Sequence, residues 1–463
     1  MITIADKDLY AAYRRNKQER SKKEFIWYDF VLPAIFLGSL GAITYAIRGS
    51  GGWGGLEGAV IPGMLMSISW YYILRRRGLN ARILVFFMGF GIATGGMWGY
   101  GQYGSWIQGD FNWLGWYINP LVGHAWTFIS GITIGGAGGI LLGYSTGRKR
   151  MTWKKWLLRL LFPVGFVMLG YLLTLLFPSL FFPWYERYGD VECVGCDRTF
   201  STNTSNFMVL MGYIGSLVCA IIERDKNTLF CGLIIGIGFG FAQMVGILWD
   251  IGYTYALGFA DWWKVWELTT GLIWGVSNVF ALHWVQREVD RNYTAEGDPI
   301  ERDNYDRTPE KLERALRRHR TVADFFSWFA LLSLLLVAYY GSTYYLGYTI
   351  GLYPYTTDQY NLLLPGRPIL LVIGFAIILA MFIPRVRYFM RHKAARNNPV
   401  FSMRDLNRKL IYLILYIFVI GILTIWDLEK ISLLYSVYLV FALIALTLLD
   451  NHYIALERTL SSW

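Results

Sequence analysis

The chain has 463 residues, of which 55% are hydrophobic and only 16% are charged, and its mean hydropathy is +0.37. Soluble globular chains are about 45–50% apolar and about 25% charged. This composition excludes a disordered chain, a coiled coil and a collagen-like repeat, and it argues against a cytosolic enzyme. The hydrophobic residues form blocks long enough to cross a bilayer, so we predict an all-α integral membrane protein.

Twelve hydrophobic blocks qualify as membrane-spanning helices. In chain order they lie at 29–48, 58–74, 83–99, 122–144, 157–177, 206–222, 229–249, 267–284, 325–346, 368–384, 410–426 and 432–450. The spans are expected to lie in the lipid bilayer, which is the first predicted partner.

The 43 Lys and Arg residues gather in the tracts between alternate blocks. Only six lie elsewhere, namely Arg48, Arg187, Arg198, Lys264, Arg367 and Lys430. An excess of basic residues marks cytoplasmic loops. We therefore predict a multi-pass protein of the plasma (inner) membrane with its N- and C-termini in the cytoplasm. The net charge of +11 belongs to these loops, so no nucleic-acid partner is expected.

One long polar stretch divides the spans into two groups. Residues 285–324 are predicted to form a cytoplasmic linker with a short amphipathic helix that begins near Pro309, since proline is favoured in the first turn of a helix. The linker separates an eight-span part, residues 1–284, from a four-span part, residues 325–463.

Glycine-rich motifs recur in the eight-span part. Residues 89–93 (Gly-Phe-Gly-Ile-Ala) resemble 238–242 (Gly-Phe-Gly-Phe-Ala), and each precedes a Trp-rich outer loop. Each loop leads into a helix whose early residues, 131–135 or 271–275, begin and end with glycine. Small residues let helices pack closely. The repeated unit is an out-and-back hairpin, and such hairpins around an axis along the membrane normal would form a ring with an outward-facing central cavity.

Candidate catalytic residues lie at the outer helix ends. They are Glu57, His124, Asp250 and Glu267. An acid in the first helical turn is also stabilised by the helix dipole, which is a purely structural explanation for Glu57 and Glu267. If the hairpins gather these ends around one mouth, two carboxylates and an imidazole could perform acid–base chemistry. No metal site and no cofactor is predicted.

Aromatic and uncharged polar residues would line the same cavity. Trp rings beside carboxylates suit a polyol, a sugar or a cation, although Trp is also common at the level of the lipid headgroups. Gln243 and Asn278 lie nearer the membrane midplane, where polar residues also form interhelical hydrogen bonds. The predicted substrate-binding residues are Arg48, Trp53, Trp98, Trp126, Trp249, Trp263, Trp266, Gln243 and Asn278.

The longest outer loop of the eight-span part contains a Cys-Val-Gly-Cys sequence. Cys193 and Cys196 are candidates for a local disulfide, because the outer face is an oxidising environment. Asn203-Thr204-Ser205 matches a glycosylation acceptor in the same region.

Three functions remain open on the sequence. The favoured prediction is a transporter or channel for a small polar, sugar-like solute that enters through the aromatic and acidic mouth. The alternative is a membrane-embedded enzyme that acts on a glycan or lipid-linked sugar at the outer face with Glu57 and Glu267. The third is a membrane scaffold subunit. The sequence predicts neither the oligomeric state nor the identity of the solute.

Overall fold

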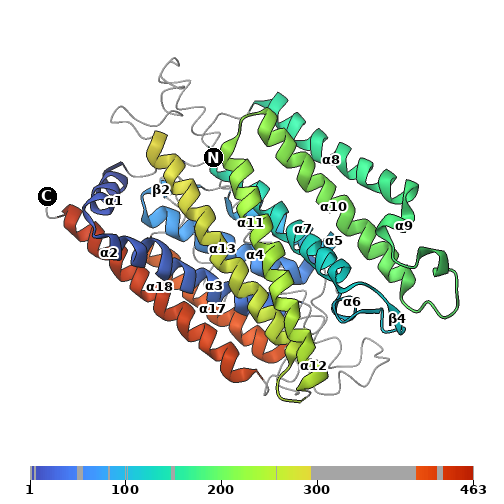
Figure 1. Cartoon of the computed structure of the whole chain (residues 1–463). Coiled ribbons are helices and arrows are strands. Elements are labelled where there is room, and N and C mark those ends of the chain that lie inside the picture. The colour runs from blue at the N-terminus through green and yellow to red at the C-terminus, as the bar shows by residue number, and fades with distance from the viewer. Residues whose placement is uncertain are drawn as a thin grey trace, which may run out of the picture.

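The computed structural model describes residues 3–4, 7–48, 56–81, 84–99, 101, 103–147, 152–256, 258–292, 403–424 and 431–461. The described chain is almost entirely helical (Figure 1). The predicted linker helix, the predicted spans at 325–346 and 368–384, and Trp53 lie outside the described residues.

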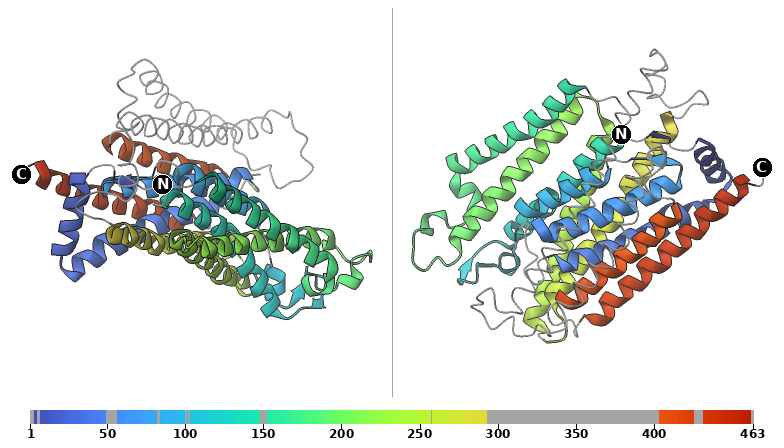
Figure 2. Two further views of the ribbon diagram at one scale, coloured as in Figure 1. Left: turned by 90° about the horizontal axis from the view of Figure 1, so that it is seen from above. Right: turned by 180° about the vertical axis from the view of Figure 1, so that it is seen from behind.

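The long helices run roughly side by side (Figure 2). They are α3 (Leu32–Ile47), α4 (Leu56–Arg76), α5 (Leu84–Trp98), α7 (Pro120–Thr146), α8 (Trp153–Leu176), α10 (Cys196–Ile222), α11 (Lys226–Gly246), α13 (Trp262–Asn292), α17 (Met403–Thr424) and α18 (Ser432–Ser461). Shorter helical segments are α1 (Lys7–Glu19), α2 (Lys22–Ile26), η1 (Trp27–Val31), α6 (Gly104–Ile107), α9 (Pro178–Phe181), η2 (Tyr185–Arg187), η3 (Ile247–Ile251) and α12 (Gly252–Tyr255).

Two very short antiparallel strand pairs complete the described elements. β1 (Thr3–Ile4) pairs with β2 (Leu79–Asn80), with Thr3 opposite Asn80. β3 (Asp110–Phe111) pairs with β4 (Trp116–Tyr117) in a small hairpin, with Asp110 opposite Tyr117.

Helix starts follow local sequence signals. Asn119 caps α7 by accepting a hydrogen bond from the backbone N–H of Leu121, and Pro120 occupies the first turn. Thr152 and Asp225 cap α8 and α11 in the same way. Side-chain oxygens at these positions satisfy backbone N–H groups that have no partner within the helix, which explains why each helix begins where it does.

Among the residues that the structure describes, seven helices are long and apolar enough to cross a membrane, so the chain is a multi-pass membrane protein by helix length and composition. These segments are Lys22–Ile47, Pro120–Thr146, Trp153–Leu176, Cys196–Ile222, Lys226–Ile251, Trp262–Arg291 and Ser432–Arg458. They coincide with seven of the twelve predicted blocks. The blocks at 58–74, 83–99 and 410–426 are helical too, as α4, α5 and α17. A count of twelve stays a prediction.

Six helices pack in a closed order. α3 contacts α4, α4 contacts α5, α5 contacts α7, α7 contacts α11, α11 contacts α13, and α13 returns to α3. We call these the six central helices. In chain order they are three hairpins, α3–α4, α5–α7 and α11–α13. α8 and α10 form one edge of the molecule, and α17 and α18 form the opposite edge against α3 (Figures 1 and 2).

Glycines set the spacing of the central helices. A Cβ atom on Gly131 of α7 would lie 2.6 Å from the Cα atom of Gly240 on α11. A Cβ atom on Gly41 of α3 would collide with the backbone oxygen of Gly271 on α13. The recurring glycine motifs therefore lie where helix backbones touch, because only glycine permits so close an approach.

Candidate functional site

Buried charged residues gather at one end of the central helices. We call this the outer end, meaning the end at which α3 finishes at Ile47 and α13 begins at Trp262. Arg48, Lys264 and Glu267 are only 4%, 6% and 2% exposed. We call these three residues the outer ionic cluster. Burying a charged group in an apolar bundle costs free energy unless the group is paired, so their partners decide how the cluster is held.

Lys264 and Glu267 form an ion pair within the first turns of α13. The Lys264 ammonium contacts Oε2 of Glu267 and donates to the backbone oxygen of Ala46 on α3 at 3.1 Å. The indole N–H of Trp263 donates to Oε1 of Glu267 at 3.2 Å. Both oxygens of the carboxylate are therefore engaged by donors from its own helix, while the lysine joins α13 to the end of α3.

Arg48 occupies the position immediately after α3 and reaches across to α5. Its Nη2 donates to the backbone oxygen of Gly96 at 2.9 Å, and its guanidinium carbon lies 5.9 Å from the centre of the Tyr45 ring. Arg48 also lies close enough to Glu267 to interact electrostatically with its carboxylate. A Cβ atom on Gly96 would touch Ala59 near the start of α4, so the ends of α3, α4, α5 and α13 meet at this cluster.

Asp250 lies at the end of the helical segment that follows α11, in η3. It is 6% exposed, and its carboxylate lies directly against Gly104 of α6. Its Oδ1 accepts no hydrogen bond from the described residues. Asp261, which caps α13 by accepting from the backbone N–H of Lys264, is close enough to interact with both Asp250 and Glu267. The outer end thus brings together acids and bases from α3, η3 and α13.

Polar groups continue from this cluster toward the middle of the bundle. One turn below Arg48, the Tyr45 hydroxyl accepts a hydrogen bond from the amide of Gln243 on α11. The rings of Tyr45 and Trp274 both pack against Phe239, with centroids 5.4 Å and 5.3 Å from its centroid. The Oε1 of Gln243 and the indole N–H of Trp274 are buried and have no hydrogen-bond partner among the described residues.

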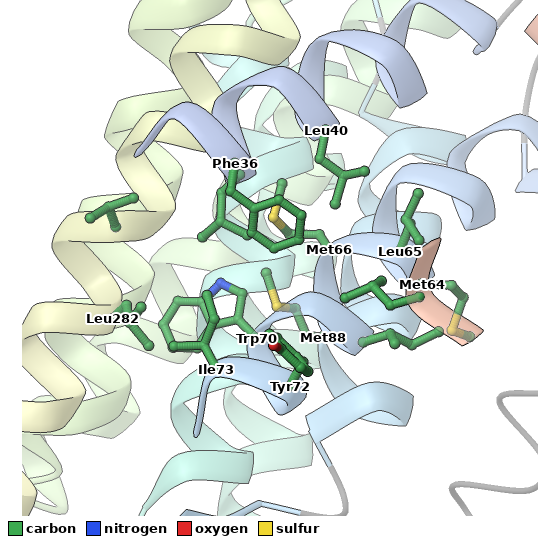
Figure 3. Close-up of a cluster of buried hydrophobic side chains, with 14 of the residues drawn as sticks. Phe36, Leu40, Met64, Leu65, Met66, Trp70, Tyr72, Ile73, Met88 and Leu282 are labelled. Carbon is green, nitrogen blue, oxygen red and sulfur yellow. The ribbon is translucent and has the colours of Figure 1, made fainter. Parts of the chain in front are cut away.

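Asn278 lies one further turn along α13. Its Oδ1 accepts from the indole N–H of Trp70 on α4 at 3.0 Å, and its amide donates to the backbone oxygen of Trp274 at 2.9 Å. Trp70 packs among Phe36, Leu40, Met66 and Met88, which point toward one another between the helices (Figure 3). Apolar side chains thus fill the middle of the central helices below Asn278.

The remaining candidates from the sequence are more scattered. Trp266 packs edge-on to Trp263 and belongs to the same end, whereas Trp249 stacks on Trp262 and is 42% exposed. Trp98 is 56% exposed. Glu57 lies in the first turn of α4, but its side chain, like all of Trp53, lies outside the described residues.

His124 and Trp126 belong to the first turns of α7. The Nδ1 atom of His124 is buried and has no hydrogen-bond partner within the described part of the chain, where no contact joins His124 to Glu267 either. Trp126 stacks against Tyr103 at 6.1 Å in a separate aromatic cluster under the β3–β4 hairpin. The described structure therefore divides the predicted residues between two neighbouring groups.

A disulfide joins Cys193 to Cys196 beside this second group. Tyr103 donates to Oδ1 of Asn203 at 2.9 Å and accepts from the amide of Asn206 at 3.1 Å. Burial raises the pKa of the Tyr103 hydroxyl, so it remains protonated and able to donate. Asn203 is completely buried and also donates to the backbone oxygen of Phe181. The Asn203 side chain of the glycosylation motif is therefore inaccessible in this fold.

Sequence reasoning missed the importance of Lys264 and Tyr45. The spacing of Lys264 and Glu267, three positions apart on a helix, places them on one face and was the available signal for their pairing. Nothing in the sequence linked Tyr45 to Gln243, which is 198 positions away. Within the described ranges, no group of three or more His, Cys, Asp or Glu residues could hold a metal ion.

No family model, curated protein or solved structure matches the chain.

Proposed function

We propose that the chain is a membrane transporter for a small polar solute and that the solute binds at the outer ionic cluster. The observation that carries this proposal is the burial of Arg48, Lys264 and Glu267 between the ends of apolar helices. Ionisable residues inside a membrane protein are costly and typically mark a solute or ion pathway. The cationic donors of Arg48 and Lys264 and the carboxylate acceptor of Glu267 suit a solute rich in hydroxyl or carboxylate groups.

The polar groups below the cluster support a pathway. Gln243 and Trp274 each have a buried polar atom that no described protein group satisfies, and such atoms usually bind water or a ligand. Both residues face the aromatic group formed with Tyr45 and Phe239. We propose that the six central helices enclose this pathway as a ring and that the packing around Trp70 closes it at mid-depth.

The same contacts favour transport over glycan hydrolysis. A glycosidase places two carboxylates on either side of the scissile bond, roughly 5–10 Å apart. Both oxygens of Glu267 are already bonded, one to Lys264 and one to Trp263. Asp250 lies against α6. Catalysis by Glu267 would first require the loss of its ion pair, whereas solute binding can use the charged pair as it stands.

Uptake into proteoliposomes tests the proposal. We would measure uptake of radiolabelled glucose, glucuronate and myo-inositol by the full-length protein, with protein-free liposomes as the blank. Replacement of a buried charged donor or acceptor that contacts the solute should reduce uptake by roughly tenfold or more, because charge-assisted hydrogen bonds contribute about 1.5–3 kcal/mol. The variants are Lys264→Gln and Glu267→Gln. Arg187→Ala is the control, since its ion pairs are exposed.

Hydrolysis of nitrophenyl glycosides by the same preparations separates transport from catalysis. Uptake of at least one probe, lost in both variants and kept in the control, supports the proposal. Glycoside hydrolysis that disappears with Glu267→Gln would instead establish the enzyme. Uptake that is insensitive to both substitutions in folded protein would show that the solute does not use this cluster.

A further inference from the structure

The N-terminal segment, residues 7–26 in α1 and α2, lies at the opposite end of the bundle from the outer ionic cluster (Figures 1 and 2). We call this the inner end, where α3 begins and α4 and α13 finish. The segment precedes α3 in the chain, yet its side chains bond to residues of α13 and α18. Residues 3–4, which precede the segment, pair as β1 with β2 in the connection between α4 and α5. The segment and the strand before it therefore contact α13, α18 and the α4–α5 connection.

Asp29, in η1 just before α3, is the centre of these contacts. It is 5% exposed. Its Oδ1 accepts from the Tyr13 hydroxyl at 2.6 Å and lies 3.3 Å from Nη2 of Arg77, while its Oδ2 accepts from Nη1 of Arg20 at 3.0 Å. Burial raises the pKa of Tyr13 well above its ordinary value, so the hydroxyl stays a donor. A single carboxylate thus joins the N-terminal segment to the start of α3 and to the end of α4.

A second carboxylate joins the segment to α13. Asp290 accepts from the Tyr10 hydroxyl at 2.7 Å and from the Lys17 ammonium at 2.9 Å. The amide of Gln286 donates to the same carboxylate at 3.1 Å. Arg20 also lies 2.7 Å from the Nε2 atom of His452 on α18, so the contacts reach the edge of the molecule.

The buried tyrosines continue the packing of the bundle interior. Tyr10 and Tyr13 are 0% and 1% exposed. They belong to the same core cluster as Trp70, Leu282 and the other side chains between the central helices (Figure 3). The segment is therefore in contact with the interior that the proposed pathway crosses, and does not merely cover the surface.

The two halves of the inner end are closed by different means. At α7 and α11 the helices touch directly, because a Cβ atom on Gly143 would collide with the backbone of Thr228, and Asn227 donates to Thr146. At α3, α4 and α13 the direct contacts are the Asp29–Arg77 ion pair and the packing of Phe30 on His283. Side chains of the N-terminal segment cover this half by bonding to Asp29 and Asp290. Removal of that segment would therefore expose one half of the inner end and leave the other half packed.

We propose that the N-terminal segment is a lid that closes the inner end of the six central helices, held by Asp29 and Asp290. The proposal rests on the proposed function, since a lid has a role only where a solute pathway exists. Release of the segment opens the interior around Leu282 to the aqueous phase on the inner side. The segment then acts as the inner gate of the transport cycle.

Thiol labelling of the full-length protein in lipid nanodiscs tests the lid without any solute. The reporter is Leu282→Cys, at a buried position two turns from Asp290, in a background with Cys231→Ser. Cys219 is buried on α10, outside the central helices, and serves as the internal control thiol. A sulfonated maleimide labels both thiols, and mass spectrometry gives the two rates.

Lid variants should raise the labelling rate of the reporter thiol alone. Removal of one partner of a buried ion pair is strongly destabilising, so Asp29→Asn should increase that rate by about tenfold or more relative to Cys219. The double variant Tyr10→Phe with Tyr13→Phe removes only the two hydroxyls and should give a smaller increase. Arg291→Ala is the matched control, because it removes an exposed ion pair with Glu288 from the same end of α13. It should leave both rates unchanged.

The outcomes are distinct. Selective labelling of the reporter in the lid variants supports the lid even if no probe solute is taken up, in which case only the proposed transport fails. Unchanged reporter labelling in folded Asp29→Asn overturns the lid even if transport is observed. If Asp29→Asn exposes both thiols equally, the tyrosine double variant decides, and anything other than selective reporter labelling there overturns the proposal.

Discussion

At the scale of single residues, the burial of the Lys264–Glu267 ion pair is a costly feature of the outer end. Both side chains are almost fully buried, at 8% and 3% exposed. The attraction between two buried charges roughly offsets the cost of removing them from water. The pair therefore contributes little net stability, yet neither partner can be removed alone without penalty.

A double-mutant cycle on the purified protein measures this coupling. Lys264→Met or Glu267→Leu alone should destabilise the fold by roughly 3–5 kcal/mol, whereas the combined variant should recover most of the loss. Thermal unfolding followed by Trp fluorescence gives the melting temperatures. Additive losses in the combined variant would mean that the two side chains are not paired in solution.

Tyr103 offers a second test at the same scale. Tyr103→Phe leaves the amides of Asn203 and Asn206 without their shared hydroxyl, and an unsatisfied buried polar group costs about 1–3 kcal/mol. Tyr117→Phe is the control, because Tyr117 is 72% exposed. Equal melting temperatures for both variants would contradict the buried network.

At the scale of helices, backbone contacts through glycine determine the packing. A Cβ atom at Gly131 has no room beside Gly240, whereas one at Gly165, in the middle of α8, meets nothing within 4 Å. The two positions therefore respond oppositely to the same substitution.

Gly131→Ala should destabilise the protein by roughly 1–3 kcal/mol, since overpacking forces the helices apart. Gly165→Ala should be neutral or stabilise it by up to about 1 kcal/mol, because alanine is the better helix former. Thermal unfolding of both variants in the same detergent checks the prediction. A lower melting temperature for Gly165→Ala than for Gly131→Ala would show that α7 and α11 do not touch as described.

The positions of the helices and of their ends could be predicted from the sequence, because hydropathy and capping residues are properties of short segments of the chain. The blocks at 122–144 and 229–249 coincide with α7 and α11, and Asn119 and Asp225 mark their starts. Partners distant in sequence were not accessible. The bond between Tyr10 and Asp290 joins residues 280 positions apart. Pairing of this kind depends on tertiary packing, which periodicity does not encode.

At the scale of the whole molecule, the basic tracts predict that both termini lie in the cytoplasm. Fusions test it. A fluorescent protein after Trp463 should fluoresce in the cytoplasm, whereas alkaline phosphatase inserted at Gly189, in the loop between α9 and α10, should be active outside. Phosphatase activity at the C-terminus with none at the loop would reverse the proposed orientation.

The closed order of the six central helices has one weak joint. Glycines fit against the neighbouring helix at five of the six joints, namely α4–α5, α5–α7, α7–α11, α11–α13 and α13–α3, but no described glycine has its nearest contacts across the α3–α4 joint. An ion pair between Asp29, just before α3, and Arg77, just after α4, crosses that joint at the inner end. Close backbone contacts prevent neighbouring helices from sliding past one another, whereas an ion pair can dissociate and re-form. We therefore expect any widening of the bundle to cost the least free energy between α3 and α4, the two helices of the first hairpin.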